Sequence, residues 1–108
     1  MKLVIAIVND DDAHNVQSEL TKNNFFVTRM STTGGFLRQG NTTFMSGVDD
    51  DKVDAVVNII KENASKRMEK EPTIPPTEMG EFFNPMMIDV LVGGATVFVL
   101  DVDQFLKF

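Results

Sequence analysis

Hydrophobic positions along the chain follow two periods, which predict strands and helices in a definite order. Residues 3–8 are continuously aliphatic, which is the pattern of a central strand buried on both faces of a sheet. Apolar residues then recur at helical spacing in two places, and predict amphipathic helices over about residues 12–22 and from the acidic run 49–51 to about Ala64. The apolar positions are Ala13, Val16 and Leu20 in the first helix and Val53, Val56, Val57 and Ile60 in the second.

Alternation of side-chain character predicts two strands between these helices and two apolar segments after them. The strands cover residues 25–33 and 41–48, which are rich in β-branched residues. The later segments, 87–93 and 95–100, are divided by Gly93-Gly94. We interpret them either as a hairpin or as one kinked strand.

The order strand, helix, strand, strand, helix, strand predicts an α+β fold, the ferredoxin-like βαββαβ sandwich. Two helices cover only one face of the sheet in this fold. The other face is not fully polar, because either Phe44 or Met45 lies on it, and either Val97 or Phe98 does too. The chain is therefore predicted to associate with itself.

The end of the chain supports the same prediction. Residues 101–105 are expected to form a short closing turn or helix, which leaves Phe105 and Phe108 to be covered. Two exposed terminal phenylalanines are unusual in a small acidic monomer, whereas a neighbouring subunit would cover them.

Residues 65–86 differ in kind from the rest of the chain. They have no clean hydrophobic period and contain all four prolines, Pro72, Pro75, Pro76 and Pro85. Irregular loops longer than about 12 to 15 residues are uncommon in compact domains and are usually functional or disordered. We therefore expect a single domain over residues 1–108 with a long flexible loop at 65–86.

Charge and composition narrow the classes of partner. The formal net charge of -6 and the pI of about 4.6 disfavour binding to DNA, RNA or an anionic membrane. No apolar run approaches the ~20 residues of a membrane span, and the chain has no cysteine. These features predict a cytoplasmic protein without membrane insertion. A small anionic ligand would require a locally positive pocket.

Each predicted helix is preceded by three adjacent acidic residues, at 10–12 and at 49–51. Carboxylates at these places suit an N-cap and the positive end of the helix dipole, and three acids also suit a metal ion. With no second cluster at ligand spacing, capping is favoured and no metal site is predicted. His14, the only histidine, lies off the apolar stripe and is predicted to face solvent.

The segment between the second and third strands carries the most chemistry. Gly34-Gly35 and Gly40 bracket four side chains that include Phe36 and Leu37. Two interpretations are open at this point. The apolar tip packs against its own domain, or it forms a pocket for a planar, phosphate-bearing ligand, with Phe36 as the stacking face and Asn41 at a base edge.

Two long motifs resemble the signature of the PII-like cyclic di-AMP receptor family, and the similarity covers nearly the whole chain. The motifs are Thr32–Arg38 with Gly40–Phe44 and Gly47-Val48, and later Val92–Val99. The resemblance implies a PII-like homotrimer that binds cyclic di-AMP in the clefts between subunits and needs no cofactor. It also implies signalling through loops to an unidentified downstream protein.

The resemblance also assigns the ligand site residue by residue. Phe36 would stack on an adenine, while Thr28 and Asn41 would make polar contacts to the base or the phosphate. The remaining residues would contribute backbone amides or allow the ligand to approach the backbone closely, and they are Gly35, Leu37 and Gly47.

The chain departs from the family pattern at Phe26, where the family usually has a basic residue, and in a shorter, more acidic long loop. The alternative function is therefore a PII-like protein-interaction module that has lost or changed its nucleotide, with Phe82-Phe83 as an anchor. Catalysis is not predicted, because we find no nucleophile paired with a base and no P-loop lysine after the glycines.

Overall fold

The structure is a computed structural model that describes residues 1–32, 40–72 and 87–108. Its elements are β1 (Lys2–Asn9), α1 (Asp10–Lys22), β2 (Thr28–Thr32), β3 (Asn41–Val48), a 3-10 helix η1 (Asp50–Lys52), α2 (Val53–Ala64), β4 (Arg67–Pro72), β5 (Met87–Val92) and β6 (Ala95–Asp101).

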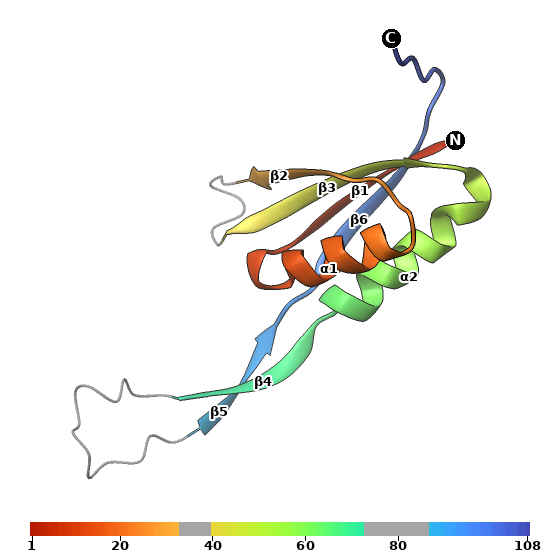
Figure 1. The fold of residues 1–108 in the computed structure, drawn as a ribbon. Helices are drawn as coiled ribbons and strands as arrows, with labels where there is room; N and C mark the ends of the chain where they lie inside the picture. Colours follow the sequence, from red (N-terminus) through yellow and green to blue (C-terminus); the bar gives the residue numbers. More distant parts are fainter. Residues whose placement is uncertain (33–39, 73–86) are drawn as a thin grey trace.

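Four strands form an antiparallel sheet in the order β2-β3-β1-β6, with β1 paired to β3 on one side and to β6 on the other. Both helices lie on one face of this sheet, and β4 and β5 form a separate ribbon that projects from it (Figure 1). The predicted α+β, ferredoxin-like class is therefore confirmed, with an added two-stranded ribbon.

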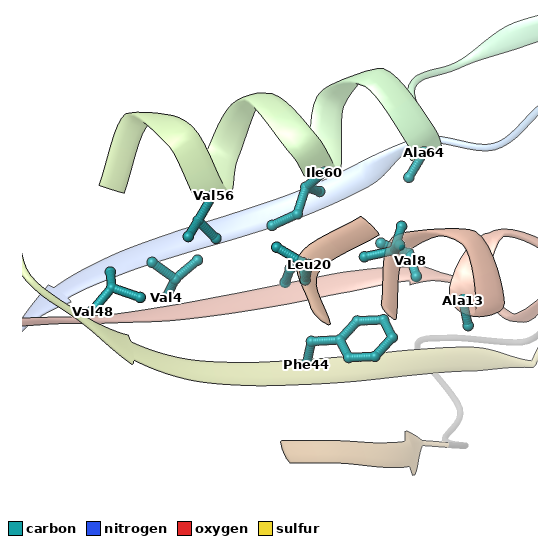
Figure 2. Close-up of a cluster of buried hydrophobic side chains, with 11 residues drawn as sticks. Val4, Val8, Ala13, Leu20, Phe44, Val48, Val56, Ile60 and Ala64 are labelled. Atoms are coloured by element: carbon teal, nitrogen blue, oxygen red, sulfur yellow. The ribbon is translucent and has the colours of Figure 1, made fainter. Parts of the chain in front are cut away.

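The core lies between the sheet and the helices (Figure 2). Alternate residues of β1 face it, and the predicted apolar stripes of both helices supply the opposite side. Phe44 is among the largest side chains that are fully buried there. The buried apolar residues are Val4, Ala6, Val8, Ala13, Val16, Leu20, Phe44, Val48, Val56, Ile60 and Ala64.

The other face of the sheet has no helix over it, and we call it the uncovered face. The prediction that β1 is buried on both faces is wrong for the single chain, because Leu3, Ile5 and Ile7 are only half-buried on this side. Their β6 neighbours Phe98 and Leu100 are 51% and 47% exposed. The residues of the uncovered face, read from the strand register, include Leu3, Ile5, Ile7, Met30, Met45, Phe98 and Leu100.

The start of α1 differs from the prediction. The helix begins at Asp10, two residues earlier than expected. Neither Asn9 nor Asp49, which precede α1 and η1, makes a side-chain cap hydrogen bond, so the predicted N-caps are wrong. The acidic residues lie in the first turns, where the helix dipole favours negative charge.

The end of α1 explains why β2 is shorter than the predicted strand 25–33. Asn24 has a φ of 64°, the Phe25 amide donates to the Leu20 carbonyl at 2.9 Å, and the Asn24 amide donates to the Thr21 carbonyl at 3.0 Å. These two bonds make a Schellman motif. Because the Phe25 amide terminates the helix, strand pairing begins only at Thr28.

The first part of the predicted long loop is instead a strand. β4 pairs antiparallel with β5, from Arg67 opposite Val92 to Pro72 opposite Met87. Met68 and Leu91 form a cross-strand pair in which each side chain is about three-fifths exposed, at 60% and 59%. Apolar alternation is required where one face of a sheet is buried, and this two-stranded sheet is separate from the body of the fold with its apolar pair exposed, which explains the missing pattern. Residues 73–86 of the predicted loop lie outside the described residues.

The hairpin interpretation of residues 87–100 is wrong, because β5 pairs with β4 whereas β6 pairs with β1. Gly93 and Gly94 join the two strands with φ values of 77° and 106°, and the Gly94 amide donates to the Ala64 carbonyl at 2.6 Å. Positive φ favours glycine and redirects the chain from the ribbon into the sheet, as the kinked-strand interpretation requires. No helix follows Asp101, contrary to one of the two alternatives predicted there.

Candidate functional site

Two of the predicted site residues lie together at one end of the uncovered face. Thr28 begins β2 and pairs with Met45 of β3, two residues before Gly47. Diagonal neighbours of this kind are about 7 to 8 Å apart. Thr28 and Gly47 are both exposed, and a Cβ added to Gly47 would meet only the Met1 Sδ, at 3.7 Å. The side chain of Met1, a residue that is 42% exposed, therefore borders the space above Gly47.

Asn41 lies at the opposite end of the same face. It begins β3, opposite Thr32 of β2 and Asn9 of β1, and is half-buried. Six residue steps along a strand separate it from Gly47, which corresponds to about 20 Å. Within one chain, the structure thus brings Thr28 and Gly47 together but not Asn41. The other predicted site residues, Gly35, Phe36 and Leu37, lie outside the described residues.

The start of β3 is fastened to the first turn of α1. The Asp10 amide donates to the Gly40 carbonyl at 3.1 Å, and the buried Thr42 hydroxyl donates to the Asp10 carboxylate at 2.6 Å. A Cβ at Gly40 would collide with that carboxylate. These contacts fix the position of Asn41, and sequence reasoning missed them because it treated Asp10 as a helix cap.

A second carboxylate of the same turn holds the ribbon. Arg67 of β4 donates from Nη2 to Asp12 Oδ1 at 2.7 Å and from Nη1 to Asp12 Oδ2 at 3.2 Å. Arg67 also donates from Nε to Glu69 at 3.1 Å. These hydrogen bonds, that to Asp12 first, raise the pKa of the Arg67 guanidinium, which stays charged. Asp12 is only 3% exposed, so the pair is a partly buried connection between α1 and β4.

A cleft of about 880 Å³ lies beside this pair, between α1 and the ribbon. Its lining includes Asp10, Asp11, Asp12, Gly40, Arg67 and Glu69. Four carboxylates against one cation make the cleft unsuitable for a phosphate-bearing ligand, although it adjoins Gly40.

Other chemical classes find little support in the described ranges 1–32, 40–72 and 87–108. No group of three or more histidine, cysteine, aspartate or glutamate residues there is arranged to hold a metal ion. His14 is exposed, as predicted. None of the helices in this part of the chain has the length and apolar character needed to cross a membrane.

Comparison with known proteins gives two findings. A family model described as "Cyclic-di-AMP receptor" matches residues 1–108, the full chain. A crystal structure of a functionally unknown protein from Pediococcus pentosaceus ATCC 25745 is similar at 46% sequence identity and a TM-score of 0.80. The similarity covers 99% of this chain and 96% of that chain.

Proposed function

The chain belongs to the cyclic-di-AMP receptor family, and from this premise we propose that it is a cytoplasmic signal-transduction protein whose homotrimer binds cyclic di-AMP between subunits. Membership in a receptor family indicates a binding role, which agrees with the prediction of no catalysis. In this proposal the bound state is passed through the loops to a downstream protein.

The observation that carries the proposal is the division of the predicted site along β3. Gly47 lies about 20 Å from Asn41 along β3, and Thr28, which is opposite Met45 on the neighbouring strand, lies about 14 Å from Asn41 on the same face of the sheet. A ligand that needs both groups would take one from each of two adjacent subunits. Two half-sites at opposite ends of one surface meet in pairs when copies close around a rotation axis.

The uncovered face supplies a physical reason for association. Its middle is apolar, with Phe98 and Leu100 about half exposed beside half-buried Ile5. Contiguous exposed apolar surface of this kind marks interaction sites. Closing a ring buries this face and brings the polar ends of the strands to the subunit boundaries. The number three comes from the family alone.

In the assembled site, the roles of the six residues are those expected from the family. Phe36 stacks on an adenine, with a contribution of about 1 to 3 kcal/mol. Thr28 and Asn41 contact base or phosphate, and Gly35, Leu37 and Gly47 allow close approach of the ligand.

Calorimetric titration with cyclic di-AMP is the first experiment, with cyclic di-GMP and ATP as controls and analytical ultracentrifugation to define the oligomer. Saturable, selective binding near one ligand per subunit of a trimer is expected. Absence of heat at high micromolar ligand, from folded and associated protein, would refute the receptor assignment for this chain.

Subunit complementation tests the shared site directly. Two variants are prepared, Asn41→Ala and Thr28→Val, and each homotrimer is expected to bind weakly. Trimers reassembled from the mixture contain boundaries where one subunit donates an intact Asn41 and its neighbour an intact Thr28. Recovery of a tight-binding fraction supports a site between subunits, and weak binding throughout the mixture would place the site within one chain.

The alternative, a PII-like interaction module with a lost or changed nucleotide, is favoured by the ribbon. Met68 and Leu91 present an exposed apolar pair on two strands whose outer edges are unpaired in the described residues. Isolated two-stranded ribbons are marginally stable, and a partner strand would stabilise this one. A purified partner protein whose affinity is unchanged by cyclic di-AMP would favour this alternative.

A further inference from the structure

Two carboxylates in the first turn of α1 connect that turn to two distant parts of the chain. Asp10 is bonded to the start of β3, where Asn41 lies, and Asp12 is bonded to Arg67 of the ribbon. Both aspartates belong to one continuous helix, whose backbone hydrogen bonds keep them in a fixed relation to each other. The inference drawn from this arrangement rests on the proposed function, since it concerns how bound cyclic di-AMP acts on the ribbon.

The contacts of Asp10 hold the chain on both sides of the proposed ligand residue Asn41. The Asp10 amide donates to the Gly40 carbonyl at 3.1 Å, and the Thr42 hydroxyl donates to Asp10 Oδ1 at 2.6 Å. Thr42 is fully buried, so water cannot replace the carboxylate as the acceptor of this hydrogen bond. A ligand that holds Asn41 in place therefore also restricts the first turn of α1.

The ribbon has few contacts with the body of the fold. In the described ranges, β4 and β5 pair only with each other, and Arg67 is the only residue of these two strands whose side chain makes hydrogen bonds with a helix. Gly93, where the chain leaves β5, has a φ of 77°, and a Cβ added to it would lie 2.6 Å from Arg67 Nη1. A flexible glycine joint and the ion pair thus meet at the base of the ribbon.

The exposure of the two partners suits a connection that can open. The Arg67 side chain is 40% exposed, whereas that of Asp12 is 5% exposed. Water can hydrate the guanidinium when the pair separates, but the Asp12 carboxylate would remain a buried charge. The closed pair is therefore favoured, and it can open without exposing the hydrophobic core.

We propose that the first turn of α1 couples cyclic di-AMP binding to docking of the ribbon. In the docked state Arg67 is bonded to Asp12, and in the undocked state these bonds are broken and the ribbon turns about Gly93. A ligand held by Asn41 orders the first turn through Asp10, and the ordered turn favours the docked state. Because coupling between two equilibria is reciprocal, docking strengthens ligand binding by the same factor.

Calorimetric titration of cyclic di-AMP into the full-length oligomer tests the coupling through affinity. Arg67→Met should weaken binding about tenfold, which is within the usual range of coupling between sites. Arg67→Lys keeps the charge and should restore affinity to within about threefold. Lys66→Met removes a neighbouring charge that takes part in no salt bridge within the described part of the chain, and it should leave affinity unchanged.

Asp12→Asn gives the proposal a sign that a direct contact does not share. If Arg67 bound a ligand phosphate itself, removal of the Asp12 charge would free the guanidinium and tighten binding. The coupling predicts weaker binding instead, by about threefold to tenfold, because the ribbon no longer docks. Thr42→Val combined with Arg67→Met should weaken binding by less than the product of the two single effects, since both interrupt one connection.

Hydrogen exchange measures the reciprocal effect on the ribbon. Saturating cyclic di-AMP should raise the protection of the β4 and β5 amides about tenfold in the unaltered protein. Thr42→Val, which keeps the side-chain shape but removes the donor to Asp10, should lose most of this gain at saturating ligand. A merely structural role for these contacts predicts no change in ribbon exchange on ligand addition. Circular dichroism and ultracentrifugation establish that each variant keeps its fold and oligomer, and the measurement on the unaltered protein depends on no variant.

The outcomes separate this inference from the proposed function. Selective binding by the unaltered protein, without added protection of the ribbon or with equal affinity in Arg67→Met, would overturn the inference and leave the receptor function standing. Tighter binding by Asp12→Asn would also overturn it, and so would a loss in Lys66→Met equal to that in Arg67→Met, which would show a general charge effect. No binding by the unaltered protein would overturn both.

Discussion

The pair between Asp12 and Arg67 allows a quantitative test of how the ribbon is held to the body of the fold. Replacing Arg67 by methionine keeps a similar length of aliphatic chain but removes both hydrogen bonds, of 2.7 and 3.2 Å, to the Asp12 carboxylate. Because Asp12 is 3% exposed, its charge would lose its partner without gaining full hydration.

The expected magnitude lies between two known limits. Removing one partner of a fully buried ion pair lowers the free energy of unfolding by about 3 to 5 kcal/mol, whereas exposed pairs contribute about 0 to 1 kcal/mol. The Arg67 side chain is 40% exposed and that of Asp12 is 5% exposed, so water reaches one partner only. We therefore expect a loss of about 2 kcal/mol.

Urea unfolding at a fixed protein concentration measures this loss, since the stability of an oligomer depends on concentration. For slopes of about 1 to 3 kcal/mol per molar urea, the midpoint should fall by about 1 M. Lys22→Met is the matched control. Its ion pair with Glu19 is exposed, so its effect should stay below about 0.5 kcal/mol.

Hydrogen exchange locates the effect. Amides of β4 and β5 should lose protection in Arg67→Met, because the pair joins β4 to α1. A double-mutant cycle with Asp12→Asn should give a coupling energy above about 1 kcal/mol. Stability within about 0.5 kcal/mol of the unaltered protein, or additive effects in the cycle, would refute the reasoning that the carboxylate depends on Arg67.

Three further predictions concern the loop base, the uncovered face and the sheet edge. Gly40→Ala puts a methyl group against the Asp10 carboxylate, which anchors β3. Thermal unfolding should show a loss of about 1 kcal/mol in the free energy of unfolding, and calorimetry should show that cyclic di-AMP binds severalfold more weakly. Equal stability and affinity would contradict this. Phe98→Glu charges the uncovered face and should yield monomers in analytical ultracentrifugation, whereas Ala55→Glu on the exposed side of α2 should not; an intact Phe98→Glu trimer would exclude this face as the interface. The hydrogen bond from Lys2 to Asp101, and after it their charge attraction, raise the pKa of Lys2. The contribution of this pair to the free energy of unfolding is therefore fully present below the ordinary pKa of 10.5 and is lost as the pH rises through the raised pKa. The stability difference between the unaltered protein and Asp101→Asn should therefore shrink above about pH 10.5, and a constant difference in denaturation measured from pH 8 to 12 would contradict this.

Much of the fold could be predicted from local pattern. The stripe of Val56 and Ile60 predicted α2, and its end at Ala64 is confirmed. The family was identified from glycine motifs in the right order, and the full-length match confirms it. The absence of catalysis, the trimer and the six site residues stay predictions, and three of those residues, Gly35, Phe36 and Leu37, lie outside the described residues.

The errors of prediction have a common physical cause. β4 has no hydrophobic period, because its neighbour in the structure is one strand, β5, and no helix packs against its exposed Met68. Asp12 looked like a helix cap because its partner Arg67 lies 55 positions later. Contacts at such separation leave no mark in a window of ten or fifteen residues.

The sequence by itself determined the helices, the central strand and the family, because periodic burial and glycine motifs are properties of neighbouring residues. Only the tertiary structure decided which face of the sheet stays uncovered, which carboxylates hold the β3 start and the ribbon, and that Thr28 and Asn41 lie at opposite ends of one surface. Those features depend on strand register and on long-range pairs, which form when the chain packs as a whole.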